Sequence, residues 1–198
     1  MRFISFEGIE GSGKSTQAKK LHEFFLSKNI AAILTREPGG TKAGEKIREI
    51  LLDEKIEKLS AASEVFLNFA ARNQHVENLI KPALQQKKIV ICDRFFDSTY
   101  AYQGAAFGFD QKVIDEVKKI AIGDFAPNIT FLIDLPIELA FSRIHNRKEN
   151  NRYEKFSADF HQKVRDGFLL LAKKNPRIKI IDGRKNPQEI FQDILQFF

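Results

Sequence analysis

The sequence has little of what a secreted or membrane protein requires. Its 198 residues include one cysteine, Cys92, so an internal disulfide framework is excluded. No apolar run approaches the roughly 20 residues that a membrane-spanning helix needs. Residues 1–7 lack the apolar stretch and the small-residue cleavage site of a secretory signal. We therefore expect a cytoplasmic protein that does not act on a membrane.

Internal repeats and low-complexity linkers are also absent, and the length suits one compact domain over residues 1–198. The net charge of +6 would attract polyanions. However, the lysines and arginines are spread along helix-like segments among 26 acidic residues instead of forming a tail. That distribution is typical of a solvated surface, and we expect no nucleic-acid partner.

Short apolar runs alternate along the chain with longer segments of helical period. Continuous apolar strands separated by helices indicate a parallel sheet that is covered on both faces. The predicted fold class is α/β, with a five-stranded parallel sheet flanked by helices. In such sheets, ligands bind at the carboxyl ends of the strands. We expect strands over residues 3–6, 31–35, 89–92, 129–133 and 178–181, and helices over 14–27, from the 38–40 turn through about Leu52, and over 60–85.

A glycine-rich loop at residues 8–15 follows the first predicted strand and matches the pattern G-x-x-x-x-G-K-[ST]. Its backbone N–H groups would point at phosphate oxygens, and the next helix would add its positive N-terminal end. We expect Lys14 to reach the β- and γ-phosphates of ATP and the Ser15 hydroxyl to join a Mg²⁺ shell. The sequence has no Asn-Lys-x-Asp guanine-reading motif, which argues against a GTPase. The predicted ATP site comprises Gly8, Ile9, Glu10, Gly11, Ser12, Gly13, Lys14, Ser15 and Thr16.

A carboxylate and a guanidinium follow the buried strand at residues 89–92. Asp93 suits a Mg²⁺ site, partly through water, and Arg94 can clamp a phosphate with two hydrogen bonds. Asp134 also ends an apolar strand, so it competes for the metal role, or it caps the next helix. We favour Asp93 for the metal.

Three polar segments are further candidates. Residues 35–41 close the second strand with the pair Arg36 and Glu37 and a rigid turn, although an ordinary strand-to-helix connection would look similar. Arg72 lies between alanines in a predicted helix. Residues 98–104 combine an amide, hydroxyls and aromatic rings, as expected of a pocket that recognises the edge and face of a base.

A polar segment between predicted helices is rich in arginine, with Arg143 before it and Arg147 and Arg152 at its two ends. The first two are spaced i, i+4 and would share one helical face. One interpretation is that these cations complement a helix C-terminus. The other is a lid, approximately residues 143–155, that closes over ATP, excludes water and delivers arginines to the transferring phosphoryl group.

With these segments in view, the sequence resembles the bacterial thymidylate kinase family over nearly its whole length. Arg-Glu-Pro-Gly-Gly at residues 36–40, together with Asp-Arg-Phe and Tyr-Gln-Gly, separates this family from adenylate and guanylate kinases. The matching segments occur in family order at residues 6–15, 35–41, 70–72, 93–95, 101–104 and 127–130.

The resemblance implies a P-loop nucleoside monophosphate kinase fold, a homodimer, and transfer of the γ-phosphoryl group of ATP to dTMP with Mg²⁺. It implies that Glu10 accepts a hydrogen bond from the sugar 3′-hydroxyl and that Glu37 lies near the sugar and the metal. Arg48 and Arg94 would hold the dTMP phosphate.

The resemblance also assigns the base contacts. Arg72 and Gln103 would hydrogen-bond thymine, helped by Ser98, and Tyr102 would exclude a ribose 2′-hydroxyl. Arg143 would stack on adenine.

Two positions vary within the family. Some members carry a catalytic arginine in the phosphate loop, but this chain has Gly11 there, so the resemblance implies the type with its arginine in the lid. The implied catalytic residues are Lys14, Arg94, Arg147 and Arg152, and Arg152 aligns best with the lid arginine. Asn68 stands where the family usually has a thymine-stacking phenylalanine. Either Phe69 takes its place in substrate binding or the stacking contact is lost.

Two alternatives stay open at this point. One is a kinase for another deoxynucleoside monophosphate, such as dUMP. The other is a P-loop regulatory ATPase, against which Arg72, Arg94 and Gln103 argue, because a simple switch needs no second nucleotide pocket.

Overall fold

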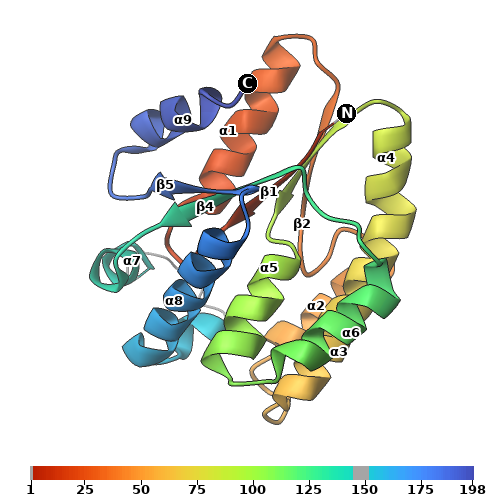
Figure 1. Ribbon diagram of the computed structural model, residues 1–198, viewed down its shortest axis with the longest axis vertical. Coiled ribbons are helices and arrows are strands. Elements are labelled where there is room, and N and C mark those ends of the chain that lie inside the picture. Colours follow the sequence, from red (N-terminus) through yellow and green to blue (C-terminus); the bar gives the residue numbers. More distant parts are fainter. Residues whose placement is uncertain (1, 145–151) are drawn as a thin grey trace.

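The computed structural model describes residues 2–144 and 152–198, and its centre is a parallel five-stranded sheet (Figure 1). The strand order is β2-β3-β1-β4-β5. This arrangement confirms the predicted α/β class, and each strand lies within one residue of its expected bounds at either end. The strands are β1 Phe3–Glu7, β2 Ala32–Arg36, β3 Ile89–Asp93, β4 Ile129–Asp134 and β5 Ile178–Asp182.

Helices cover both faces of the sheet (Figure 1). The α-helices are α1 Lys14–Ser27, α2 Lys42–Leu52, α3 Ala61–His75, α4 Lys81–Gln85, α5 Phe96–Thr99, α6 Gln111–Ile122, α7 Ile137–Ile144, α8 Ala158–Lys174 and α9 Pro187–Leu195. Two π-helical segments, η1 Val76–Ile80 and η2 Tyr100–Ala106, and a 3₁₀ turn, η3 Arg152–Lys155, complete the described elements. No helix within the described ranges is both long enough and apolar enough to span a membrane.

The central strand β1 is buried along its whole length, and successive side chains enter different parts of the core. Phe3 packs in a cluster with residues of α3 and α6, whereas Ile4 and Phe6 pack in a second cluster with α1 and α9. A third cluster joins α7 and α8 to η2. Burial on both faces explains why β1, β3 and β4, which are buried over most of their length, are mostly apolar.

Sheet register brings the chemically active segments together. Phe6 of β1 pairs with Asp93 of β3, so the strand that leads into the glycine loop ends beside the Asp93–Arg94 pair. The N–H of Arg94 donates to the carbonyl of Phe6 at 2.9 Å, and the N–H of Glu37 donates to the carbonyl of Asp93 at 2.9 Å. Three candidate segments therefore meet at one edge of the sheet.

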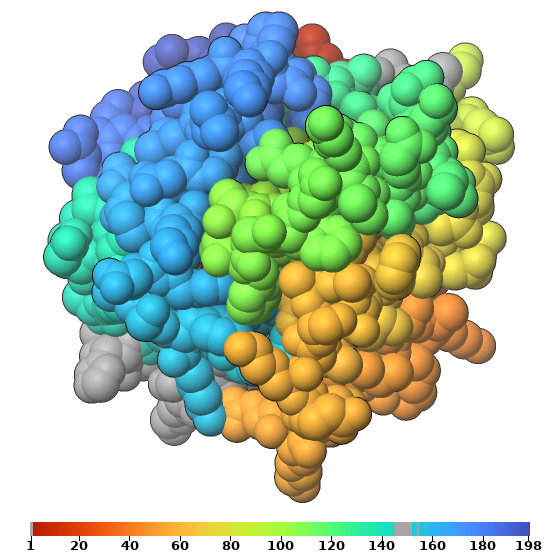
Figure 2. All heavy atoms as spheres, turned by 60° about the horizontal axis from the view of Figure 1, so that its bottom comes forward, coloured from red at the N-terminus to blue at the C-terminus, as the bar shows by residue number. Residues whose placement is uncertain are grey.

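The helix expected over residues 60–85 is one helical run with a π-helical turn, η1, between α3 and α4. Pro82 has no N–H to donate to the carbonyl of Asn78. The N–H of Lys81 donates to the carbonyl of Val76, five residues earlier, which is the π-helical pattern. On the face shown in Figure 2, α8 packs along η2, and α3 packs along α6.

Candidate functional site

A cavity of about 290 Å³ opens at the carboxyl ends of β1 and β3. Most of the residues that the sequence nominated for ATP, acceptor and metal binding line it. These are Glu10, Gly11, Gly13, Lys14, Ser15, Thr16, Glu37, Arg48, Asp93, Arg94, Ser98, Tyr102 and Gln103. The loop residues Gly8, Ile9 and Ser12 are buried beneath this lining.

The glycine loop leads directly into α1, whose N-cap Gly13 has φ 94° and provides no side-chain cap. The first N–H groups of α1 are therefore available to a bound anion. The Lys14 ammonium lies among the loop carbonyls and donates to that of Ile9 at 3.2 Å. Burial, and then the neighbouring Arg94, lowers the pKa of Lys14 to about 8. This combination of donors and a cation is suited to phosphate.

Arg94 also lines the cavity, where its guanidinium contacts the glycine loop. Its Nη1 donates to the Gly8 carbonyl at 3.1 Å and to Ser98 Oγ at 3.0 Å. Its Nη2 donates to Glu10 Oε1 at 2.8 Å and to Tyr102 Oη at 3.0 Å. The guanidinium is thus fixed by groups from the loop, α5 and η2, and it can present a rigid charge to an anion in the cavity.

A buried carboxylate supports the backbone at Arg94, which has a left-handed φ of 71°. Glu7 accepts the N–H of Phe95 at 2.7 Å and the hydroxyl of Ser98 at 2.6 Å. Burial, and then the nearby charge of Asp97, raises the pKa of Glu7 to about 8. A left-handed conformation at a non-glycine residue costs free energy, and these two hydrogen bonds hold it in place.

Glu10 is the anionic centre of the cavity. Tyr102 donates its hydroxyl to Glu10 Oε2 at 2.6 Å, and His161 Nδ1 lies 3.5 Å from the same oxygen. Burial alone would raise the pKa of Glu10, but the charge of Arg94, the His161 contact and Lys14 together hold it well below its usual range. Glu10 is therefore an ionised hydrogen-bond acceptor at neutral pH.

The predicted base-binding arginine, Arg72, is 2% exposed and lies outside the cavity lining. Its Nε donates to Glu37 Oε2 at 2.7 Å and its Nη1 to Thr99 Oγ1 at 3.2 Å. The other Glu37 oxygen lies 3.0 Å from His75 Nδ1. Glu37 and Thr99 both line the cavity, so Arg72 acts on it here through these two neighbours.

Ser15 and Asp93 fit a magnesium ion. Asp93 Oδ1 is buried, and no donor in the described part of the chain pairs with it. Mg²⁺ commonly keeps several waters and uses one or two carboxylates, so a larger cluster is not required. Residues 2–144 and 152–198 contain no group of three or more His, Cys, Asp or Glu arranged around a metal position. One orphaned carboxylate beside a hydroxyl and the phosphate loop matches this mode of binding.

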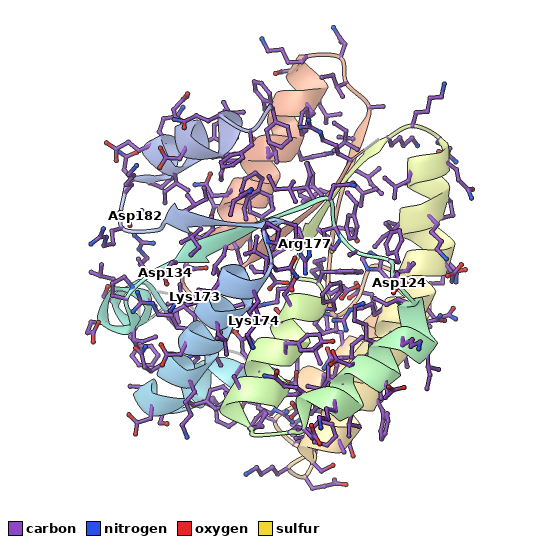
Figure 3. All side chains as sticks on the ribbon, in the orientation of Figure 1. Asp124, Asp134, Lys173, Lys174, Arg177 and Asp182 are labelled. Atoms are coloured by element: carbon purple, nitrogen blue, oxygen red, sulfur yellow. The ribbon has the colours of Figure 1, made fainter. Side chains whose placement is uncertain are left out.

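The competing carboxylate, Asp134, is engaged elsewhere. Both of its oxygens accept from Arg165, at 2.7 and 2.9 Å. Figure 3 shows Asp134 near Asp182, its register partner on β5, and neither residue lines the cavity. Asp134 is thus paired with an arginine, whereas Asp93 Oδ1 has no donor among the described residues.

Phe69 and Arg143 are two more nominated residues that, like Arg72, lie outside the cavity lining. Phe69 is 1% exposed in the core, with the Arg72 guanidinium 4.6 Å from the centre of its ring. Asn68 lines the cavity instead, so the expectation that Phe69 faces the base does not fit this geometry. Arg143 donates to the Gly183 carbonyl at 3.0 Å from the last turn of α7 and lies outside the lining.

The expected lid falls partly on residues outside the described ranges, and Arg147 is one of them. Arg152 opens η3 and pairs with the carboxylate of Glu64 on α3. Tyr153 Oη and Gln103 Nε2 donate to the same carboxylate, at 3.0 and 2.7 Å. Nothing in the sequence nominated Glu64, because an acidic residue in a helix is ordinary.

Several lining residues were not nominated either. Thr99 belongs to the polar segment 98–104 and could have been included with Ser98. The apolar residues carried no chemical signal that would separate them from core residues. The additional lining residues are Arg36, Pro38, Leu51, Leu52, Asn68, Thr99 and Tyr153.

The chain is similar to known proteins over nearly its whole length. The sequence profile of the family described as Thymidylate kinase matches residues 6–194. Thymidylate kinase of Carboxydothermus hydrogenoformans is 46% identical over 196 residues, covering 99% of this chain and 96% of the relative. That of Symbiobacterium thermophilum is 42% identical over 193 residues, covering 97% and 90%. The crystal structure of thymidylate kinase from Ehrlichia chaffeensis superposes with a TM-score of 0.80 at 40% identity, covering 99% and 97%.

Proposed function

This chain belongs to the thymidylate kinase family, and from that premise we propose that it transfers the γ-phosphoryl group of ATP to dTMP, giving dTDP and ADP. One observation carries the proposal: a single cavity joins the glycine loop of an ATP site to a second set of polar groups around Arg94 and Gln103. Family membership does not favour a regulatory ATPase or a kinase for a different nucleotide.

Positioning and electrostatics would supply most of the catalysis, as in other phosphoryl transfers. The loop N–H groups and Lys14 hold the phosphates of ATP. Arg94 and Arg48, which both line the cavity, would hold the acceptor phosphate so that the reacting oxygens approach in line. Burial of these charges strengthens each interaction relative to water.

We assign Mg²⁺ to Ser15 and Asp93, partly through water. The unpaired Asp93 oxygen and the position of Ser15 in the lining support this assignment. A bound Mg²⁺ would bridge phosphate oxygens and neutralise charge during transfer. Lys14, beside Ser15, would keep the same phosphates oriented.

The acceptor nucleoside would be recognised along η2 and α3. Gln103 would contact thymine, with Ser98 nearby and Arg72 acting through Glu37 and Thr99. Tyr102 would lie against the 2′ position of the sugar. The cavity-facing positions of Gln103, Ser98 and Tyr102 support these roles. Glu10 would accept a hydrogen bond from the 3′-hydroxyl of the sugar. Glu37, which is paired with Arg72, would lie near the sugar.

We propose that residues 1–198 work as one domain with a lid at approximately 143–155. In this arrangement Arg152 is the main catalytic arginine, with Arg147 as its companion and Arg143 close to the adenine. Support for Arg152 comes from its place in η3, next to the cavity residue Tyr153.

We further propose a homodimer that works in the cytoplasm, where its nucleotide substrates are made and used. α3 packs between α2 and α6, and each of these helices exposes a large apolar side chain. They are Ile50 on α2, Phe66 on α3 and Ile120 on α6, with exposed fractions of 39%, 57% and 85%. Burial of such side chains against a second copy would remove apolar surface from water.

A coupled ADP-release assay across dTMP, dUMP, dCMP, dGMP and AMP tests the reaction. We expect kcat/KM to be highest for dTMP and ADP release to depend on the acceptor. Faster turnover with AMP or dGMP would overturn the dTMP assignment. ADP release at the same rate without any acceptor would point to the regulatory ATPase.

A further inference from the structure

Glu64 is a buried carboxylate that lies next to the cavity without lining it. It is 1% exposed and sits in the first turn of α3. Gln103 Nε2 donates to its Oε2 at 2.7 Å, and Tyr153 Oη donates to the same oxygen at 3.0 Å. Arg152 pairs with Oε1. Two of these partners, Gln103 and Tyr153, face the cavity.

The chemistry of Glu64 fixes the orientation of the Gln103 amide. A carboxylate that is paired with a guanidinium only accepts hydrogen bonds, whereas an amide has a donating end and an accepting end. The nitrogen of Gln103 must therefore face Glu64. Its oxygen has no hydrogen-bond donor in the described part of the chain, so it is the polar atom left for a ligand.

An amide oxygen held in this way distinguishes bases by their N3 position. Thymine and uracil carry an N3–H that can donate to it. Cytosine has a lone pair at N3, which would meet the oxygen without a proton between them. An unpaired or repelled polar group in a buried site costs more than a well-made hydrogen bond contributes.

We propose that Glu64 is a positioning residue for base selection: it locks the Gln103 amide so that the cavity accepts a base with an N3–H and rejects one without it. This inference rests on the proposed function, because it takes the base of the acceptor to lie at Gln103. Glu64 touches neither the nucleotide nor the reacting atoms.

The lid contacts of Glu64 require a measurement that separates two effects. Loss of the Arg152 and Tyr153 contacts would alter lid closure and lower kcat for every acceptor. Loss of the Gln103 contact would change one acceptor relative to another. The ratio of kcat/KM for dTMP to kcat/KM for dCMP isolates the second effect, because changes common to both substrates cancel.

The test is Glu64→Gln, which keeps the shape of the side chain. A glutamine can present either its oxygen or its nitrogen, so both orientations of the Gln103 amide become available. We expect the ratio of kcat/KM for dTMP to kcat/KM for dCMP to fall by about tenfold, because a turned Gln103 amide can donate to N3 of cytosine. In a Gln103→Leu background the amide is gone, and Glu64→Gln should not change the ratio further.

Glu54→Gln is the matched control. Glu54 accepts from Lys155 at 2.6 Å, so this change weakens a different contact of η3 by the same chemical substitution and leaves Gln103 alone. We expect this variant to keep the wild-type ratio of kcat/KM for dTMP to kcat/KM for dCMP. If Glu64→Gln unfolds, Glu64→Asp, which still only accepts, should keep a ratio close to that of the wild type.

An unchanged ratio in folded Glu64→Gln, with kcat reduced equally for both substrates, would overturn the proposal and leave Glu64 a lid contact. A ratio that also falls in Glu54→Gln would overturn it as well. Both results differ from failure of the proposed function, in which the wild-type protein itself would not phosphorylate dTMP.

Discussion

At the scale of single residues, Gly11 restricts where positive charge can enter the site. Its φ is 76°, and a Cβ at this position would lie 2.6 Å from the Ala140 carbonyl oxygen and 3.1 Å from Ile144. An L side chain is strained in that conformation and would have to displace α7. An arginine in the loop is therefore incompatible with this backbone. The charge that stabilises the transferring phosphoryl group has to come from Lys14 and from outside the loop.

Lys14 makes ATP binding depend on pH. Its pKa in the free protein is lowered to about 8 by burial and by Arg94. Bound phosphates favour the charged ammonium, so ATP binding raises this pKa and takes up a proton. Affinity should be constant below about pH 8 and fall above it, by up to about tenfold per pH unit, because the free lysine must first be protonated.

Isothermal titration calorimetry of ATP between about pH 6.5 and 9.5 measures this dependence. Near pH 8, titrations in buffers of different ionisation enthalpy should give an uptake of about half a proton per ATP. Lys14→Arg stays charged throughout the range and should show a flat profile. The same decline in Lys14→Arg would show that another group controls the binding.

At the scale of elements, η3 connects the lid to the acceptor side. Arg152 pairs with Glu64 on α3, and Lys155 pairs with Glu54 at the exposed surface. To act on a phosphate, this guanidinium would have to leave its carboxylate partner. We therefore expect lid closure and base binding to be coupled through α3.

Arg152→Ala should lower kcat by about a thousandfold, the range known for arginines that stabilise phosphoryl transfer, with little change in KM for dTMP. Initial-rate kinetics with both substrates varied would measure this. Lys155→Ala, on the same turn, should change kcat by less than about threefold, since exposed ion pairs contribute little. Turnover at the wild-type level in Arg152→Ala would remove Arg152 from the mechanism.

Helices and strands in which apolar residues follow a regular spacing were predictable from the sequence. The buried strands are continuous apolar runs, and the glycine loop lies between a strand and a helix as its motif requires. The π-helical turn Val76–Ile80 was not predictable, because its cause is one missing donor at Pro82 inside an otherwise regular helical pattern.

The positions of side chains that depend on tertiary packing could not be predicted from the sequence either. Helical period says which residues share a face, but not which face meets the cavity. It therefore did not show that Asn68 lines the cavity while Phe69 is buried in the core. Glu64 gains its role from Gln103 and Tyr153, which are 39 and 89 residues away in the chain. A pattern within one helix cannot contain that information.

At the scale of the whole molecule, the cavity lies where three apolar clusters meet. One cluster anchors α1, which follows the phosphate loop, and a second anchors α3 and α5 on the acceptor side. The third contains Tyr102 and, at its edge, Tyr153 and Phe156 next to the lid. Each part of the site is therefore attached to a different portion of the core.

We expect the proposed homodimer to form through α3, which buries Glu64 and Arg72 and exposes Phe66. We expect the wild-type protein to be a dimer at micromolar concentration and Phe66→Lys to be largely monomeric, as measured by size-exclusion chromatography with light scattering. A lysine in an apolar interface would lose its hydration without gaining a partner. Leu26→Lys on α1, where the native side chain is 49% exposed compared with 57% for Phe66, is the matched control and should stay dimeric. A monomeric wild-type protein, or equal dissociation in both variants, would place the apolar side chains of α2, α3 and α6 outside any dimer interface.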